Sequence, residues 1–141
     1  MRYLDRLQPL ALLVLRLTLG IILLAHGYPK VFGGGFHGHA DFVAKLGMPH
    51  WMAYLSTCTE TLGASAILLG LFTRCFSLAV VIEMLVIIFK VEYHHGLKGG
   101  YELPLALAAM AFTLIFLGGG PISLDAIRGG GGGRRIGGKI R

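Results

Sequence analysis

The stretch Leu10–Tyr28, LALLVLRLTLGIILLAHGY, decides the fold of this chain. It is apolar throughout except for one charge near its middle, Arg16. About 20 apolar residues at a rise of ~1.5 Å each cross the ~30 Å hydrocarbon core of a bilayer, so the stretch is predicted to be a transmembrane helix. A charged side chain is costly in lipid, and we therefore expect Arg16 to face protein and to be neutralised there.

The composition of the whole chain agrees with a membrane protein. Of the 141 residues, 55% are hydrophobic and 14% are charged, with a mean hydropathy of +0.71. Soluble domains carry about 25% charged residues. No cleavage signal follows the first apolar stretch, which we expect to be retained as a helix. The net charge of +6 gathers at the C-terminus, which favours a membrane surface over nucleic acid as its partner.

Three further apolar segments predict three more membrane helices, at Trp51–Phe72, Cys75–Val91 and Tyr101–Leu117. Gly27 and Pro29 are expected to end the first helix. Cys58 and Cys75 fall at different depths, too far apart for a disulfide.

Between the first two helices, residues 36–46 place apolar side chains at helical spacing. This spacing predicts a short amphipathic helix lying in the interface, with an ordered loop as the alternative. The predicted fold class is therefore all-α, an integral membrane four-helix bundle with a short amphipathic helix in the first extracytoplasmic loop. The bundle is predicted to take up residues 1–128, and residues 129–141 are expected to form a flexible cytoplasmic tail rich in glycine and arginine.

The distribution of basic residues predicts the orientation. With four membrane helices both termini lie on one side, and that side collects more Lys and Arg than the other, which the positive-inside rule assigns to the cytoplasm. We therefore expect a multi-pass protein of the inner membrane with both termini cytoplasmic. The two sets are Arg2, Arg6, Arg74, Arg128, Arg134, Arg135, Lys139 and Arg141 against Lys30, Lys45, Lys90 and Lys98.

Four charges are predicted within the membrane, and they sum to zero: Arg16, Glu60, Glu83 and Lys90. Counting depth at ~1.5 Å per residue predicts that Arg16 pairs with Glu60, with Glu83 alongside or bridged to Lys90. Two interpretations stay open. The charges form a proton or quinone site, or they form a buried network that fixes how the helices pack.

A second group of polar residues is expected near the outer mouth. His26, Lys30, Tyr101 and Glu102, together with Glu60, are candidates for hydrogen bonds to a quinone head group; interfacial anchoring is the alternative. Imidazoles suit metal ions such as Zn, Cu and Fe, but the spacing of His37, His39, His94 and His95 is not diagnostic, and no metal site is predicted. No motif for a nucleophile, a bound phosphate or an attached cofactor occurs.

Three segments together resemble the DoxX family of small four-helix membrane proteins. They are RLTLGIILLAHGYPKVFG, ETLGASAILLGLFTR and GGYELPLALAAMAFTLIFLGGGPISLD, with the GMP turn at residues 47–49. Glu83 and the tail after Arg128 fall outside the family pattern. Mapped onto this sequence, that pattern falls on Arg16, His26, Gly27, Lys30, Glu60, Gly63, Tyr101, Glu102 and Asp125.

The resemblance implies a subunit of a membrane oxidoreductase assembly. Some members are linked to quinone reduction by thiosulfate or to a terminal quinol oxidase, and others to thiol and superoxide defence. We therefore expect partners among membrane or peripheral oxidoreductase subunits and the lipid bilayer, no intrinsic cofactor, and quinone as the candidate ligand. No catalytic residue is assigned. A purely structural subunit and a small transporter remain the alternatives.

Overall fold

The computed structural model describes residues 2–129, and this part of the chain is helical with no strand. The longest helix is α2 (Gln8–Phe32), and the second long segment is continuous through α4 (Trp51–Cys58), η1 (Thr59–Gly63) and α5 (Ala64–Leu69). It is followed by α6 (Thr73–Ile87), η2 (Ile88–Glu92) and α7 (Glu102–Leu117). The shorter elements are α1 (Arg2–Asp5), α3 (Phe36–Lys45), η3 (Tyr93–His95), η4 (Leu97–Tyr101) and α8 (Leu124–Arg128). The all-α prediction is confirmed for the described residues.

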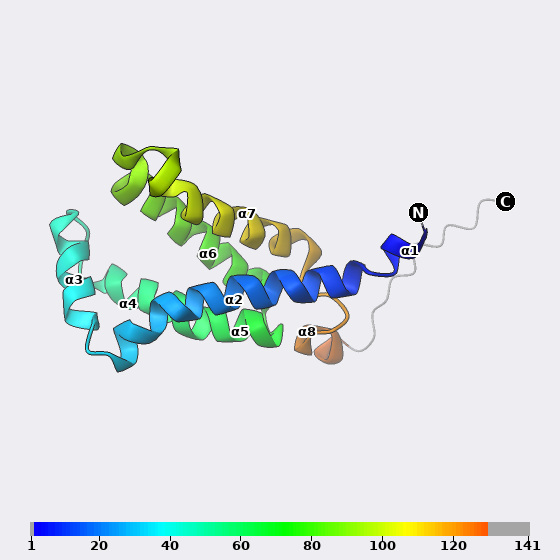
Figure 1. Ribbon diagram of the computed structural model, residues 1–141. Coiled ribbons are helices and arrows are strands. Elements are labelled where there is room, and N and C mark those ends of the chain that lie inside the picture. The colour runs from blue at the N-terminus through cyan, green and yellow to red at the C-terminus, as the bar shows by residue number, and fades with distance from the viewer. Residues whose placement is uncertain (1, 130–141) are drawn as a thin grey trace.

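The long helices lie side by side, with α2 along α5 and α6 along α7. One end of the molecule carries α3 and the turns η3 and η4, and the opposite end carries α1 and α8 (Figure 1). Two segments, Gln8–Phe32 and Leu97–Leu117, are long and apolar enough to cross a membrane. Within the second, η4 is a turn rather than regular helix, because Gly99 and its neighbours have non-helical backbone angles.

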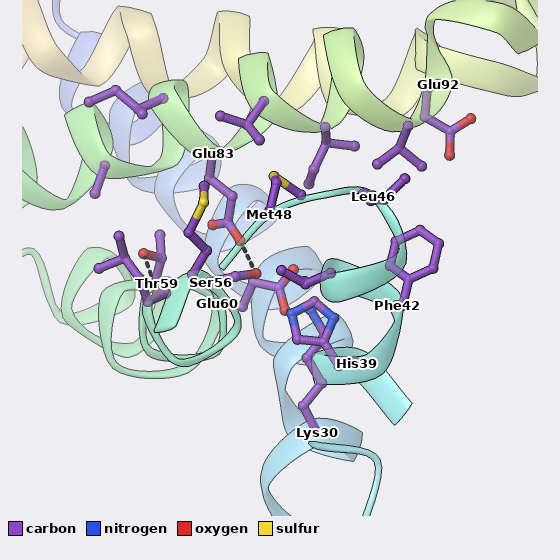
Figure 2. Close-up of a pocket in the computed structure, with 18 residues that line it drawn as sticks. Lys30, His39, Phe42, Leu46, Met48, Ser56, Thr59, Glu60, Glu83 and Glu92 are labelled. Carbon is purple, nitrogen blue, oxygen red and sulfur yellow. Dashed lines mark hydrogen bonds and ion pairs between the residues drawn. The ribbon is translucent and has the colours of Figure 1, made fainter. Parts of the chain in front are cut away.

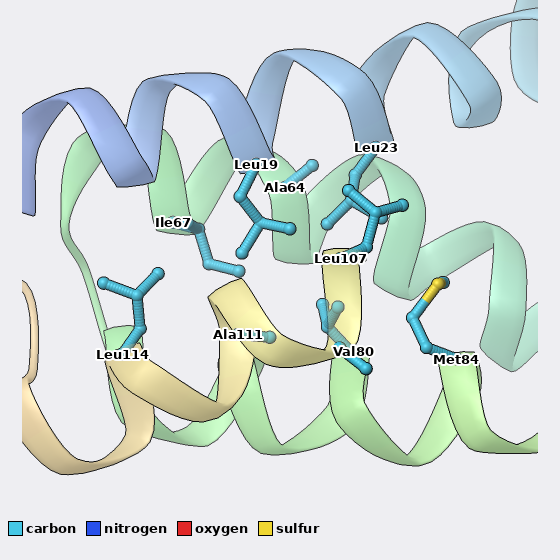
Figure 3. Close-up of a cluster of buried hydrophobic side chains, with 10 residues drawn as sticks. Leu19, Leu23, Ala64, Ile67, Val80, Met84, Leu107, Ala111 and Leu114 are labelled. Carbon is cyan, nitrogen blue, oxygen red and sulfur yellow. The ribbon is translucent and has the colours of Figure 1, made fainter. Parts of the chain in front are cut away.

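The core lies where these helices meet. Side chains from α2, α5, α6 and α7 interdigitate in one cluster, and small residues let the helices approach closely (Figure 3). Large apolar side chains also point outward on every long helix, as expected for a surface that faces lipid. The buried members are Leu19, Leu23, Ala64, Ile67, Val80, Met84, Leu107, Ala108, Ala111 and Leu114.

The prediction that Gly27 and Pro29 end the first helix is wrong, since α2 continues to Phe32. Gly27 is buried at a close helix crossing, where an added Cβ would lie 2.7 Å from Thr61 Cγ2. The glycine is thus required by packing and not by a turn. Pro29 removes one backbone hydrogen bond, and its exposed ring is accommodated within the last turn. The additional turn brings Lys30 to the level of the second long helix.

Other boundaries also shift. The second helix was expected to reach Phe72 but ends at Leu69, because Gly70 adopts a left-handed conformation with φ +70°. The segment predicted as amphipathic forms helix α3, with Ala40 and Val43 on its buried side. The predicted tail, residues 129–141, lies outside the described residues except for Gly129.

Candidate functional site

A cavity of about 450 Å³ lies between α3, α4, η1, α6 and η2, at the α3 end of the molecule. Its walls are mostly apolar, and most of its polar side chains lie near one another, with Glu92 apart from them (Figure 2). We call Lys30, His39, Ser56, Glu60 and Glu83 the polar end. The apolar wall consists of Phe42, Val43, Leu46, Met48, Met52, Leu55, Ala79, Ile82, Val86, Ile87 and Val91, and Thr59 and Glu92 complete the lining.

An ion pair forms one side of the polar end. Lys30 Nζ, at the end of α2, donates a hydrogen bond to Glu60 Oε2. The Glu60 side chain is 7% exposed and that of Lys30 is 18% exposed. Glu60 lies in η1, a π-helical turn inside an otherwise α-helical segment. Such turns insert an extra residue into the helix and occur frequently at functional sites.

A second carboxylate faces this pair from α6. Ser56 Oγ donates a hydrogen bond of 2.5 Å to Glu83 Oε1, while Glu83 Oε2 is buried without a partner. One acceptor position of Glu83 is therefore free to take a hydrogen bond from a bound molecule. Unpaired buried polar atoms are costly, and a hydrogen bond from a bound molecule would remove this cost at Glu83.

His39 reaches the cavity from α3, and its Nε2 is buried without a partner. Burial and the nearby charge of Lys30 both lower the pKa of His39, so its imidazole is neutral at pH 7. A neutral imidazole can donate from one ring nitrogen and accept at the other. From the sequence, His39 was weighed only as a metal ligand and Ser56 was not proposed as a site residue. Both could have been found by asking which residues share the buried face of their helix.

The other sequence candidates lie outside the cavity. His26 is exposed, with Nδ1 2.8 Å from the carbonyl oxygen of Ile22 in its own helix. Tyr101 and Glu102 stand at the start of α7 and do not line the cavity. Of the five predicted quinone contacts, the structure thus brings only Lys30 and Glu60 together. Among residues 2–129, no three His, Cys, Asp or Glu side chains are placed to hold a metal ion.

The predicted pairing of Arg16 with Glu60 is wrong. Arg16 is buried at the opposite end of the bundle and donates only to backbone carbonyl oxygens. It binds Ile67 O (3.0 Å) and Leu68 O (2.8 Å) at the end of α5. It also binds Gly119 O (2.7 Å) and Ile122 O (2.6 Å) in the segment after α7. The last carbonyls of a helix lack intrahelical donors and carry the negative end of its dipole, which suits a guanidinium.

The wrong pairing came from the predicted depth of Arg16 along its helix. Ile67 is seven positions beyond Glu60, or about 10 Å along the helix, so Arg16 lies that much farther from the cavity. Because α2 ends at Phe32 rather than Tyr28, Arg16 is about 6 Å deeper than expected. The expected bridge from Glu83 to Lys90 is also absent from the described contacts: Glu83 binds Ser56, and Lys90 is exposed.

Asp125 completes the end of the molecule that contains Arg16. Its carboxylate accepts hydrogen bonds from the backbone amides of Phe72 (2.8 Å) and Thr73 (2.9 Å), and so caps the start of α6. Burial alone would raise the pKa of Asp125, but the hydrogen bonds from Thr73 and Phe72 outweigh it and lower the pKa. The Asp125 carboxylate thus ties the segment after α7 to the start of α6.

Comparison with known proteins places this geometry in context. The model of the DoxX family matches residues 11–93. The "Inner membrane protein YphA" of Escherichia coli (strain K12) is 32% identical over 139 residues, covering 89% of this chain and 96% of the relative. The protein named "Putative oxidoreductase CatD" of Bacillus subtilis (strain 168) is 28% identical over 113 residues, covering 80% of this chain and 83% of the relative. No solved structure matches the chain significantly.

Proposed function

The chain belongs to the DoxX family of membrane proteins, and from this premise we propose that it is a quinone-contacting subunit of a membrane oxidoreductase. The head group of the quinone occupies the cavity, with its oxygen atoms at the polar end. The observation that carries the proposal is the grouping of Lys30, His39 and Glu83 at one end of a mostly apolar cavity. The name of the Bacillus subtilis relative, "Putative oxidoreductase CatD", points in the same direction.

The chemistry of a quinone suits this lining. The ring is flat and apolar, and its two carbonyl oxygens accept hydrogen bonds. Lys30 and His39 supply donors, and the apolar wall surrounds the ring. In the reduced quinol the oxygens become donors, and Glu83 Oε2 is a free acceptor at the same end of the cavity. Both redox states therefore find partners among the same residues.

Reduction of a quinone to a quinol takes up two electrons and two protons. His39 and Glu83 are side chains that can hold and pass protons next to the bound head group. The electrons come from a partner subunit that carries a flavin, haem or iron–sulfur centre. The role of this chain is therefore to bind and orient the quinone and to exchange its protons, while the redox centre lies in its partner.

We further propose four membrane passes with both termini in the cytoplasm. The segments α2, α4–α5, α6–η2 and α7 are the four passes, and α3 covers the extracytoplasmic end. The excess of basic residues near the termini supports this orientation. Single cysteines introduced at His37 and at Arg128, in a chain lacking Cys58 and Cys75, test it with a membrane-impermeant thiol reagent. Labelling of both positions from the same side of the membrane would contradict the topology.

Binding is tested with the purified full chain in detergent, by calorimetric titration with a short-chain ubiquinone and with its quinol. His39→Ala removes a donor and is expected to weaken binding of the quinone about tenfold, and Glu83→Gln removes a carboxylate acceptor and is expected to weaken binding of the quinol about tenfold, the value of one hydrogen bond to a charged or buried partner. The matched controls are Glu102→Gln and His26→Ala, which change the same residue types outside the cavity.

The controls are expected to bind the quinone like the wild type. Melting curves must show that all four variants are folded. If Glu102→Gln or His26→Ala weakens binding while Glu83→Gln and His39→Ala do not, the quinone site lies at the outer mouth and not in the cavity. If the folded wild type does not bind the quinone, the proposed function itself is wrong.

A further inference from the structure

The geometry points to a lateral opening of the cavity into the bilayer between α4 and α6. We propose that the isoprenoid tail of a membrane-borne quinone leaves through this opening, which we call the portal and define by Leu55 and Ile82. This inference rests on the proposed function and specifies its substrate as a long-tailed, lipid-dissolved quinone that enters from the membrane. A water-soluble quinone arriving from the aqueous side would not need such an opening.

The exposure of the two portal residues carries the argument. Leu55 on α4 and Ile82 on α6 both line the cavity, yet they are 56% and 55% exposed. A side chain that borders a cavity and is also half exposed stands where the cavity meets the outer surface. Both residues are apolar, so the surface they open onto is suited to lipid chains rather than to water.

The portal adjoins the polar end of the cavity. Leu55 precedes Ser56 on α4, and Ile82 precedes Glu83 on α6. The hydrogen bond from Ser56 to Glu83 therefore links the same two helices at the level of the portal. A head group bound at the polar end has its ring close to the opening, as a molecule with a polar head and an apolar tail requires.

The packing of the helices explains why an opening exists here. α6 packs against η1 and α5, but α4 and α6 diverge toward the α3 end (Figure 1). The other side of the cavity is lined by α3 and the turn after it, through Phe42, Leu46 and Met48 (Figure 2), and the Phe42 side chain is 45% exposed. Toward η2 the lining ends at the partly exposed carboxylate of Glu92. Leu55 and Ile82 are more exposed than Phe42, and the portal is thus an apolar route out of the cavity.

The size of the cavity requires a tail to leave it. A volume of about 450 Å³ lies toward the small end of ligand pockets, which run from about 300 to 1,000 Å³. A ring with its substituents fits in such a space, but a tail of several isoprene units does not. Because the tail is apolar, it is stable only in contact with the apolar wall or with lipid.

The test compares two probes on the purified full chain in detergent: 2,3-dimethoxy-5-methyl-1,4-benzoquinone, which has no tail, and its decyl-tailed analogue. Leu55→Trp and Ile82→Trp place a bulky side chain in the portal. The controls are Leu62→Trp and Leu78→Trp, which alter exposed residues of the same helical segments that do not line the cavity. The quantity measured is the ratio of the two dissociation constants. Partitioning of the probes into micelles changes this ratio by the same factor in every variant, so differences between variants report on the protein.

In the wild type and in both controls, the tailed probe is expected to bind at least tenfold more tightly than the probe without a tail. In the two portal variants this ratio is expected to fall to about one, with binding of the tailless probe changed less than threefold. If the ratio is the same in portal variants and controls, the portal is wrong although the quinone site stands. If neither probe binds to any folded form of the chain, the proposed function fails and the portal with it.

Discussion

Replacing Arg16 with methionine is predicted to be the most damaging single change in this chain. The guanidinium joins the end of α5 to the segment after α7 through four hydrogen bonds of 2.6–3.0 Å. Methionine fills a similar volume and donates no hydrogen bond. The variant therefore isolates the loss of the donors from the loss of packing.

The expected loss of stability follows from the carbonyl acceptors that Arg16→Met leaves without a donor. The carbonyl of Ile67 keeps a second donor, the backbone amide of Gly70, at 3.0 Å. The carbonyls of Leu68, Gly119 and Ile122 lose the donor that Arg16 supplies. A buried acceptor left unsatisfied costs about 1–3 kcal/mol, and of these three the carbonyl of Gly119 is buried while those of Leu68 and Ile122 are partly buried, so we expect a loss of about 2–6 kcal/mol in the free energy of unfolding. This is a large part of the stability of a small protein, about 5–15 kcal/mol.

The assay is reversible unfolding in mixed micelles, followed by circular dichroism. Because Arg16→Met can fail to fold, Arg16→Lys is measured beside it. The lysine ammonium keeps the positive charge but lacks the planar set of donors of the guanidinium, so we expect a smaller loss, about 1–3 kcal/mol, in the free energy of unfolding. Arg74→Met is the control, since exposed Arg74 makes one long hydrogen bond of 3.3 Å to Phe116 O. A loss for both Arg16 variants no larger than for Arg74→Met would refute the structural role given to Arg16.

The remaining predictions concern coupling, packing and pH. The effects of Arg16→Lys and Glu60→Gln on the free energy of unfolding should add within about 0.5 kcal/mol, because the two residues share no partner. A larger coupling in a double-mutant cycle in micelles would show that they do interact. Gly27→Ala should cost about 1–3 kcal/mol, since its Cβ would lie 2.9 Å from the backbone of Glu60, whereas Gly38→Ala, with open space around its Cβ, should be neutral; equal melting temperatures would contradict this. Asp125→Asn should lower stability by about 0.5–2 kcal/mol at pH 7 through the weakened cap. Because folding lowers the pKa of Asp125, the wild type should lose this advantage as pH falls below about 4, and a difference that persists at pH 2 would contradict the role of the charge.

Several features could be predicted from the sequence because they depend on local chemistry. Long apolar runs must be helical where lipid offers the backbone no hydrogen bonds, and this requirement predicted the all-helical structure of residues 2–129. The spacing of apolar residues in 36–46 likewise predicted α3. Lys30 and Glu60 were both named as candidate quinone contacts, but their direct pairing was not predicted.

The partners of the charged residues were decided by the tertiary structure. Arg16 binds backbone carbonyls, which every residue possesses, and such acceptors leave no mark in a sequence. The pairing of Lys30 with Glu60 depends on α2 continuing past Pro29, which is possible because Gly27 fits against the second helix. His39 and Glu83 acquire free polar atoms only because α3 and α6 enclose one cavity. Helix formation is a local property of the chain, whereas the partner of a buried charge depends on how distant helices pack, and that depends on shape.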